Sequence, residues 1–229
     1  MTILFVSRSW TVGRRPSTFD PRRPGMGQSQ ARPLLTGLIL ILLMSVGACA
    51  STPPSRFFIL SPTQDSAPST ALSENGLIRL EPVRLPEYLN RPHIITRIGP
   101  NRLHLGEFDK WAEPLDVNVT RVLAKNLETR LKAGVIFSPH YAADQTDVRI
   151  QVQVLRFDCG PDGSSTLVAR WVASMDDDGR STITRETSST RTGTGAGYEA
   201  AAQAMSLNLD DLAADIARTL KSSQFGDIN

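Results

Sequence analysis

Apolar side chains recur every three or four residues in two segments of the chain, residues 115–131 and 198–223. This spacing places them on one side of an α-helix, so the sequence predicts two long amphipathic helices that bury their apolar faces. We expect the first helix to begin at Pro114, with Asp116 in its first turn, and to stop at Gly134 in the left-handed conformation. The two stripes are Leu115, Val119, Val122, Leu123, Leu127 and Leu131, and Ala201, Met205, Leu209, Leu212, Ile216 and Leu220.

Alternation of apolar and polar residues predicts β-strands at residues 148–158 and 165–175. One face of each strand is apolar and the other is mostly polar, as in a sheet with one solvated face. A turn at Asp178 and Gly179 then returns the chain, which predicts a long hairpin. The apolar faces are Val148, Ile150, Val152 and Val154 in the first strand and Leu167, Ala169, Trp171 and Ala173 in the second.

Shorter β-like runs lie at residues 57–60, 77–80 and 135–137. Two further runs, HIITRIG and RLHLGEF, flank the turn sequence GPN at residues 99–101, which predicts another hairpin. Pro82 limits the run at 77–80 to an edge strand or a broken strand. Six or seven strands result, and those that precede the first helix are expected to form a small antiparallel set.

The stretch LTGLILILLMSVGACAS, at residues 35–51, is apolar and then ends at small residues and a cysteine. Its apolar run is about half of the ~20 residues that a transmembrane helix needs. With Arg32 before it, the stretch follows the order of an export signal. We therefore interpret residues 1–48 as a signal peptide that is removed, and residues 1–25 as an over-extended gene start before Met26.

The end of this signal, Val46, Gly47, Ala48 and Cys49, resembles the bacterial lipobox that the lipoprotein signal peptidase recognises. In such signals the thiol receives a diacylglycerol, cleavage follows just before the cysteine, and the new amino group is acylated. Three acyl chains hold a protein on a membrane far more firmly than one does. An ordinary secretory peptide that happens to carry a cysteine is the alternative.

After the signal we expect a lipidated tether at residues 49–56 and a folded domain at residues 57–229. The predicted elements give a single α/β domain, with a mixed, largely antiparallel β-sheet packed by two long amphipathic helices. No second domain and no internal repeat is expected.

The charge of the chain argues against a nucleic-acid partner. The whole sequence has a formal net charge of +2, but the expected signal peptide holds six arginines and one aspartate, so the mature chain is slightly negative. A nucleic-acid-binding surface would need a strongly basic field. Lipidation of Cys49 would leave Cys159 without a disulfide partner, and we expect Cys159 to be a small, half-buried side chain at a strand end.

Candidate catalytic groups are few and scattered. His93, His104 and His140 have no second metal ligand or carboxylate at a suitable spacing. The acidic residues 176–178 lack the further ligands of a calcium loop, so we expect a solvated turn there. The glycine-rich residues 191–201 precede a helix but lack the Lys and Ser/Thr of a P-loop. The sequence therefore predicts a protein that is not an enzyme and that holds no cofactor and no metal.

Two segments combine proline, aromatic and charged residues where a plain core element would not need them: residues 81–97 and 108–127. In these segments the chain resembles the ABC-type transport auxiliary lipoprotein family. The family usually has Arg where this chain has Lys110, which weakens any expectation of a bidentate contact there. The resemblance continues at residues 57–62, at Trp171 and at Tyr198. Its main carriers are Pro82, Val83, Leu85, Pro86, Tyr88, Leu89, Arg91, Pro92, Ile94 and Arg97, and then Trp111, Ala112, Glu113, Pro114, Leu115 and Asp116.

This resemblance implies an α/β domain similar to the amino-terminal domain of TolB, lipid-anchored on the periplasmic face of the outer membrane. It implies transport of lipids between the inner and outer membranes, with an MCE-domain substrate-binding protein, an ABC permease and its ATPase as partners. Ring-shaped homo-oligomers are compatible with it, and Ala50 after the lipidated residue agrees with sorting to the outer membrane. The favoured role is a non-catalytic docking or adaptor subunit. The alternatives are a periplasmic lipid-binding carrier with its own acyl-chain cavity and a surface hydrolase.

We expect residues 85–97 and 111–116 to lie together, and either to brace the fold or to present a surface to a partner. In the bracing alternative, Trp111, Pro114 and Leu115 seat the first helix while Glu113 and Asp116 cap it. The candidate residues for both alternatives are Leu85, Pro86, Tyr88, Arg91, Trp111, Glu113, Pro114 and Asp116.

Overall fold

Eight strands and two long helices are seen in a computed structural model that describes residues 37, 53–63, 77–137, 148–174 and 181–223. A single turn of 3-10 helix, η1, lies at Glu87–Leu89. The helices are α2 at Leu115–Leu131 and α3 at Gly197–Ser222. The strands are β1 (Arg56–Phe58), β2 (Leu77–Leu80), β3 (His93–Gly99), β4 (Arg102–Trp111), β5 (Gly134–Ile136), β6 (Val148–Cys159), β7 (Ser164–Ser174) and β8 (Thr182–Thr192).

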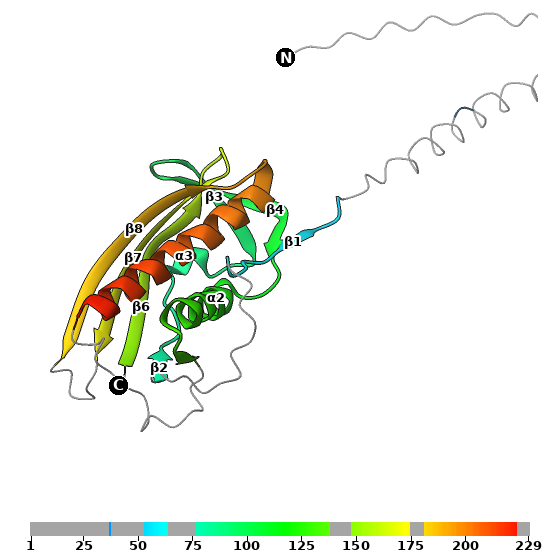
Figure 1. Ribbon diagram of the computed structural model, residues 1–229. Helices are drawn as coiled ribbons and strands as arrows, with labels where there is room; N and C mark the ends of the chain where they lie inside the picture. Colours follow the sequence, from blue (N-terminus) through cyan, green and yellow to red (C-terminus); the bar gives the residue numbers. More distant parts are fainter. Residues whose placement is uncertain (1–36, 38–52, 64–76, 138–147, 175–180, 224–229) are drawn as a thin grey trace, which may run out of the picture. The chain divides into compact units, whose positions relative to one another are not determined.

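The long strand β6 organises the sheet (Figure 1). One edge of β6 pairs antiparallel with β7 along most of its length, and β7 pairs antiparallel with β8. The other edge of β6 is shared, because its first residues pair with β2 and its last residue, Cys159, pairs with Thr96 of β3, both in parallel. β5 lies beyond β2, whereas β4 and then β1 lie beyond β3.

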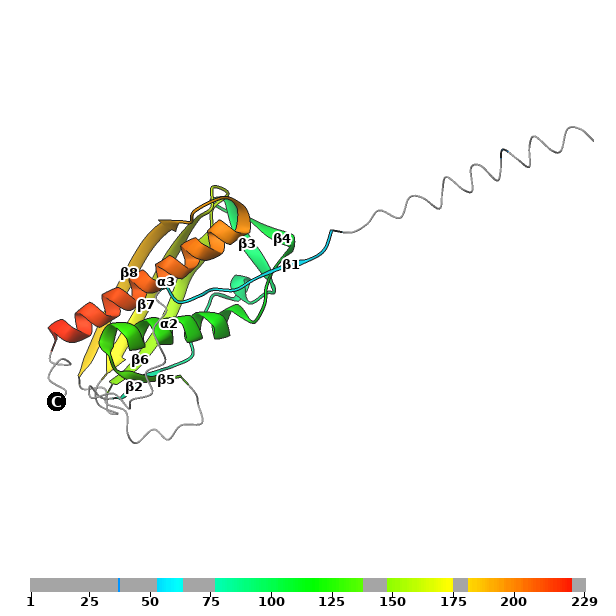
Figure 2. The same cartoon turned by 45° about the vertical axis from the view of Figure 1, so that its right-hand side comes forward.

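Both helices cover the same face of the sheet. In Figures 1 and 2, β6, β7 and β8 curve around α3, and α2 lies beside α3. The two helices are joined by an ion pair between Arg130 and Asp210, with 2.6 Å between Nη2 and Oδ2. Within the described ranges, no helix combines the length and the apolar character that are needed to cross a membrane.

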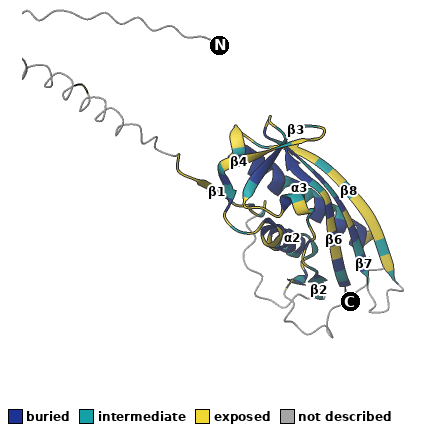
Figure 3. Ribbon diagram, turned by 180° about the vertical axis from the view of Figure 1, so that it is seen from behind, coloured by how far each residue is buried: buried dark blue, intermediate teal, exposed yellow. Residues whose placement is uncertain are grey.

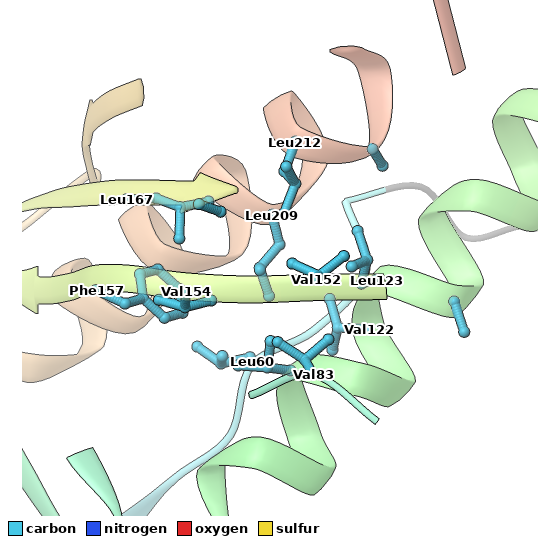
Figure 4. Close-up of a cluster of buried hydrophobic side chains, with 14 of the residues drawn as sticks. Leu60, Val83, Val122, Leu123, Val152, Val154, Phe157, Leu167, Leu209 and Leu212 are labelled. Atoms are coloured by element: carbon cyan, nitrogen blue, oxygen red, sulfur yellow. The ribbon is translucent and has the colours of Figure 1, made fainter. Parts of the chain in front are cut away.

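The core lies between this face of the sheet and the helices. Figure 4 shows Val122 and Leu123 of α2 and Leu209 of α3 packed against side chains of β6, with Leu60 and Val83 completing the cluster. Each of these side chains is at most 3% exposed. A fully buried aliphatic side chain contributes roughly 1.5–3 kcal/mol through loss of contact with water, so this cluster is the main source of stability.

The expected fold class is confirmed, because one domain contains a mixed sheet packed by two long helices. Both amphipathic helices lie where the periodicity places them, and every residue of the second predicted stripe is buried. The alternation in β6 and β7 buries the predicted faces. The two hairpins, β3–β4 and β7–β8, are also as predicted.

The strands near the amino terminus differ from the antiparallel set that we expected. β1 pairs in parallel with β4, and β2 pairs in parallel with both β5 and β6. β2 is therefore a broken strand and not an edge strand, because it has a neighbour on each side and ends before Pro82. Alternation fixes which face of a strand is buried, but it does not select the neighbouring strand.

The end of α2 also differs from the expectation. Lys132 adopts the left-handed conformation, with φ of 55°, and its N–H donates to the Glu128 carbonyl at 2.9 Å. Gly134, the expected stop, is instead the first residue of β5 and pairs with Leu77. A Cβ atom at Gly134 would come within 3.1 Å of Leu77 Cδ1, so the glycine leaves room for the Leu77 side chain. Pro114 lies one residue before the helix.

Candidate docking site

Residues 81–84 fill the gap between β2 and β3 along the shared edge of β6. The N–H of Glu81 donates to the Ile150 carbonyl at 2.9 Å, and the N–H of Arg84 donates to the Val152 carbonyl at 3.0 Å. Val83, between them, turns the other way: its N–H donates to Thr120 Oγ1 of α2 at 3.0 Å, and its side chain enters the core. This segment is thus held by the sheet and by α2 together, and it forms a rigid wall.

A cavity of about 670 Å³ lies beside this wall, on the face of the sheet that the helices leave open; we call it the β6 groove. Alternation along β6 and β7 brings Gln151, Gln153 and Arg170 to this face, while Val152 and Trp171 point mainly to the core. Asp116, in the first turn of α2, lines the groove as well. The full lining is Glu81, Pro82, Val83, Arg84, Leu85, Glu87, Asn90, Asp116, Gln151, Val152, Gln153, Arg170 and Val172.

Ion pairs compensate the charges of the β6 groove only in part. Arg170 pairs with Glu186 of β8 at 3.1 Å, but both side chains are about half exposed, so the pair is weak. Within the described part of the chain, Arg84, Glu87 and Asp116 form no ion pair. The groove therefore offers carboxylates, a guanidinium and amide groups next to the apolar surface of Leu85 and Val172, which is the chemistry that an interface between proteins requires.

The two motif segments, residues 81–97 and 108–127, meet in space. The N–H of Trp111 donates to the Pro92 carbonyl at 2.7 Å, and His93 pairs with Lys110 in the ladder between β3 and β4. Trp111 is 6% exposed and belongs to the core, to which Leu85 and Tyr88 are also packed. This side of the motif braces the fold.

The remaining motif residues face solvent. Arg91 and Asp116 are exposed, and Pro86 is half-buried. Glu113 pairs with Arg121 of α2 instead of capping the helix, and no side chain caps its amino terminus. The expected capping by Glu113 and Asp116 is therefore wrong. The reason is that Glu113 reaches along the helix to a guanidinium, while Pro114 takes the N-cap position and lacks a polar side chain.

A buried carboxylate connects the motif to β6. Asp158 is 1% exposed and accepts hydrogen bonds from Arg97 Nε at 2.8 Å, from Arg156 Nε at 3.0 Å and from the Tyr88 hydroxyl at 3.4 Å. We call these four residues the Asp158 cluster. Its members come from η1, from β3 and from β6. The hydrogen bonds to one carboxylate therefore connect three parts of the fold.

The surroundings of Arg97 and Tyr88 in the Asp158 cluster keep both side chains protonated. The hydrogen bond to Asp158 raises the pKa of the Arg97 guanidinium. Burial, and to a lesser extent the negative charge of Asp158, raises the pKa of the Tyr88 hydroxyl. Arg97 therefore stays protonated as the partner of Asp158, and Tyr88 stays a neutral donor.

Sequence reasoning missed two of the residues that position this site. In the sequence, Asp158 is one more polar residue near a strand end. Its place between the apolar Phe157 and Cys159 could have indicated that it is buried. Asn118 lies beside the apolar stripe of α2 and is 1% exposed. Its side chain accepts from the Leu60 N–H at 2.7 Å and donates to the Leu60 carbonyl at 3.2 Å, which fixes the chain after β1.

Several predicted positions lie outside the described residues. These are the lipidation residue Cys49, the recognition residues Val46, Gly47 and Ala48, and also His140 and the acidic residues 176–178. His93 and His104 lie on the neighbouring strands β3 and β4. In the described ranges, no three side chains of His, Cys, Asp or Glu gather in a way that could hold a metal ion.

Cys159 is more deeply buried than we expected. It is 1% exposed, and its Sγ lies 3.4 Å from Sδ of Met205. Burial, with a smaller contribution from the charge of Asp158, raises the pKa of the thiol from 9.0 to about 12. Since the thiolate is the reactive form, the folded protein holds this cysteine in an inert state.

A thiol reagent tests this directly. In a chain that begins at residue 53, Cys159 is expected not to react with Ellman's reagent at mildly alkaline pH, and to react fully once urea unfolds the protein. Because the pKa is higher in the folded state, the free energy of unfolding should also fall as the pH rises from about 9 toward about 12. Rapid reaction of the native protein would show that Cys159 is accessible.

Comparison with known proteins shows the family of this chain. Residues 58–217 match the sequence pattern of the family described as ABC-type transport auxiliary lipoprotein component. The intermembrane transport lipoprotein PqiC of Escherichia coli K12 is 26% identical over 136 residues, which cover 59% of this chain and 72% of that protein. The protein of the same name from Shigella flexneri shows the same values.

Two crystal structures share the fold. A protein described as uncharacterized has 21% identity and a TM-score of 0.61, with 73% of this chain and 99% of that chain covered. A protein of Xanthomonas campestris has 18% identity and a TM-score of 0.56, with 75% and 99% covered. The family match covers both motif segments, the strands from β2 to β8 and most of α3, and so the chain belongs to the family of ABC-type transport auxiliary lipoprotein components.

Proposed function

We propose that this lipoprotein is a non-catalytic docking subunit of an MCE-type ABC transport system that moves lipids between the inner and outer membranes. In this proposal, acyl chains on Cys49 hold it on the periplasmic face of the outer membrane. An MCE-domain substrate-binding protein docks on the folded domain and is connected in turn to a permease and its ATPase. Membership in a transport auxiliary family and the name of the PqiC relatives support the transport role.

The β6 groove is the observation that carries the docking role. Its wall is the motif segment at residues 81–84, which hydrogen bonds to β6 and α2 hold in place. A rigid wall favours docking, because a partner then loses no free energy in ordering it. The lining mixes charged, amide and apolar side chains, so a partner can be bound both by burial of apolar area and by specific hydrogen bonds.

A lipid carrier would need a different cavity. An acyl chain is bound best in an enclosed apolar space, with its polar end at the mouth. The β6 groove instead presents Arg84, Glu87 and Asp116 to water, and the space between the sheet and the helices is filled by the core of Figure 4. The adaptor role therefore fits the β6 groove better than the carrier role does.

Filling the β6 groove should weaken the docking. Gln153→Trp places a bulky side chain in the groove, at an exposed position of β6, and should lower recovery of the MCE-domain partner by roughly tenfold, or about 1.4 kcal/mol. The measurement is co-purification from detergent-solubilised envelopes. The matched control is Ser188→Trp, an exposed position of β8 that does not line the groove.

The same preparations separate the two roles. Equal recovery of the partner with both variants would show that the groove is not the docking site. Phospholipid that stays with the purified domain in molar amounts, and that Gln153→Trp displaces, would instead support the carrier role. Mass spectrometry of extracted lipids makes that measurement.

A further inference from the structure

The largest exposures of apolar side chains occur at one place in the described fold. Phe57 is 65% exposed, Val117 51% and Ile59 48%, whereas the other exposed large apolar side chains range from 38% to 42%. We call these three residues the Phe57 patch. Contact between water and such side chains is unfavourable. A local group of them indicates a surface that binds an apolar partner.

The strand geometry turns two of these residues away from the core. β1 pairs in parallel with β4, so that Phe57 lies opposite Lys110 and Phe58 lies opposite the buried Trp111. Since side chains alternate along a strand, Phe58 faces the core and Phe57 and Ile59 face outward. Figure 3 shows exposed positions along the segment at β1.

Val117 belongs to the same region because the chain after β1 is bound to α2. The side chain of Asn118 makes two hydrogen bonds to the backbone of Leu60, at 2.7 and 3.2 Å. Ile59 and Val117 are the residues next to these two partners, so their backbones lie near each other. An ion pair between Arg56 and Asp109, at 2.7 Å, holds the other end of the segment. The patch is thus mounted rigidly.

The covalent chain limits the distance between this patch and the lipidation residue. Seven residues separate Cys49 from Phe57, and two of them, Pro53 and Pro54, are prolines. An extended chain spans at most about 3.5 Å per residue, so Phe57 lies no more than about 28 Å from Cys49. A lipid on Cys49 would therefore keep the most exposed apolar side chain of the domain close to the bilayer surface.

We propose that the Phe57 patch rests in the interface of the membrane that carries the anchor, with phospholipid as its partner. This inference rests on the proposed lipidation of Cys49. Phe, Ile and Val side chains gain free energy when they enter the boundary between headgroups and acyl chains, a few ångströms deep. The acyl chains then supply the attachment, and the patch fixes the orientation of the domain on the membrane.

A fluorescent label at the patch tests this arrangement. The full-length protein is produced in a Gram-negative bacterium with Ile59→Cys, labelled with the polarity-sensitive dye NBD, and reconstituted in vesicles of phosphatidylethanolamine and phosphatidylglycerol. We expect blue-shifted emission and several-fold stronger quenching by nitroxide-bearing lipids than with the control, Ser188→Cys on β8. Phe57→Cys provides a second labelled position, and Cys159 is too buried to compete for the dye.

Each outcome has a distinct meaning. If the labelled protein does not float with the vesicles, the lipidation in the proposed function is wrong. If it floats but the dye at residue 59 behaves like the dye at residue 188, the patch faces water and the inference is overturned. A blue shift that nitroxide lipids do not quench, and that increases with protein density, would mean that a second copy covers the patch, which also overturns it.

Discussion

The Cys49→Ser chain is expected to take up no labelled palmitate and to retain its amino-terminal segment, whereas the wild-type chain becomes lipidated and shorter. The reason is chemical, because the thiol accepts the diacylglycerol and cleavage follows that step. Each buried acyl CH₂ contributes ~0.8 kcal/mol, so loss of several chains removes the attachment that the acyl chains supply. Growth with tritiated palmitate and gel fluorography detects the lipidation, and intact-mass measurement detects the cleavage.

The second cysteine provides the matched control. Cys159→Ala removes a thiol that is buried in the core, so palmitate incorporation and processing should stay as in the wild type. If Cys49→Ser is processed and labelled like the wild type, the tetrad at residues 46–49 is not a lipobox. The proposed attachment of the docking subunit to the membrane would then be wrong.

Asp158→Ala should destabilise the fold more than the loss of a surface carboxylate does. It leaves Arg97 and Arg156 without the buried carboxylate that accepts from both, and removal of one partner of a buried ion pair typically costs about 3–5 kcal/mol. Their side chains are 25% and 43% exposed, so water can solvate them in part. We therefore expect a decrease of about 3 kcal/mol in the free energy of unfolding, measured by urea denaturation.

A surface pair serves as the comparison. Glu186→Ala removes the partner of Arg170 at an exposed site, and such pairs contribute about 0–1 kcal/mol. A similar small effect of both substitutions would mean that the Asp158 cluster does not hold η1, β3 and β6 together. The bracing role of Tyr88 and Arg97 would then have to be abandoned.

Hydrophobic periodicity predicted the long elements because their faces are sharply divided. Apolar and polar residues alternate over many positions in β6 and β7, and the apolar stripes of α2 and α3 each extend over several turns. Burial of the apolar face therefore determines whether each segment is a strand or a helix. The short strands carry much less information. β1 and β5 have three residues each, and their parallel partners come from segments far along the chain.

The candidate site could be predicted only in part. One of the motif segments contains residues 81–84, which build the wall of the β6 groove. The sequence could not separate bracing residues such as Trp111 from surface residues such as Asp116, because both occur in one short run and only the tertiary packing decides which of them is covered. Gln151, Gln153 and Arg170 were visible as a polar strand face, but their position opposite the motif depends on the sheet topology.

The parallel pairing of β1 with β4 determines how the domain bears mechanical load. A pull that reaches residue 53 along the axis of β1 acts on its register pairs in shear, so they must rupture together instead of opening one after another. The bonds between Asn118 and Leu60 lie directly behind them and share the strain. Under the proposed lipidation of Cys49, a pull from the membrane would reach the fold at these pairs.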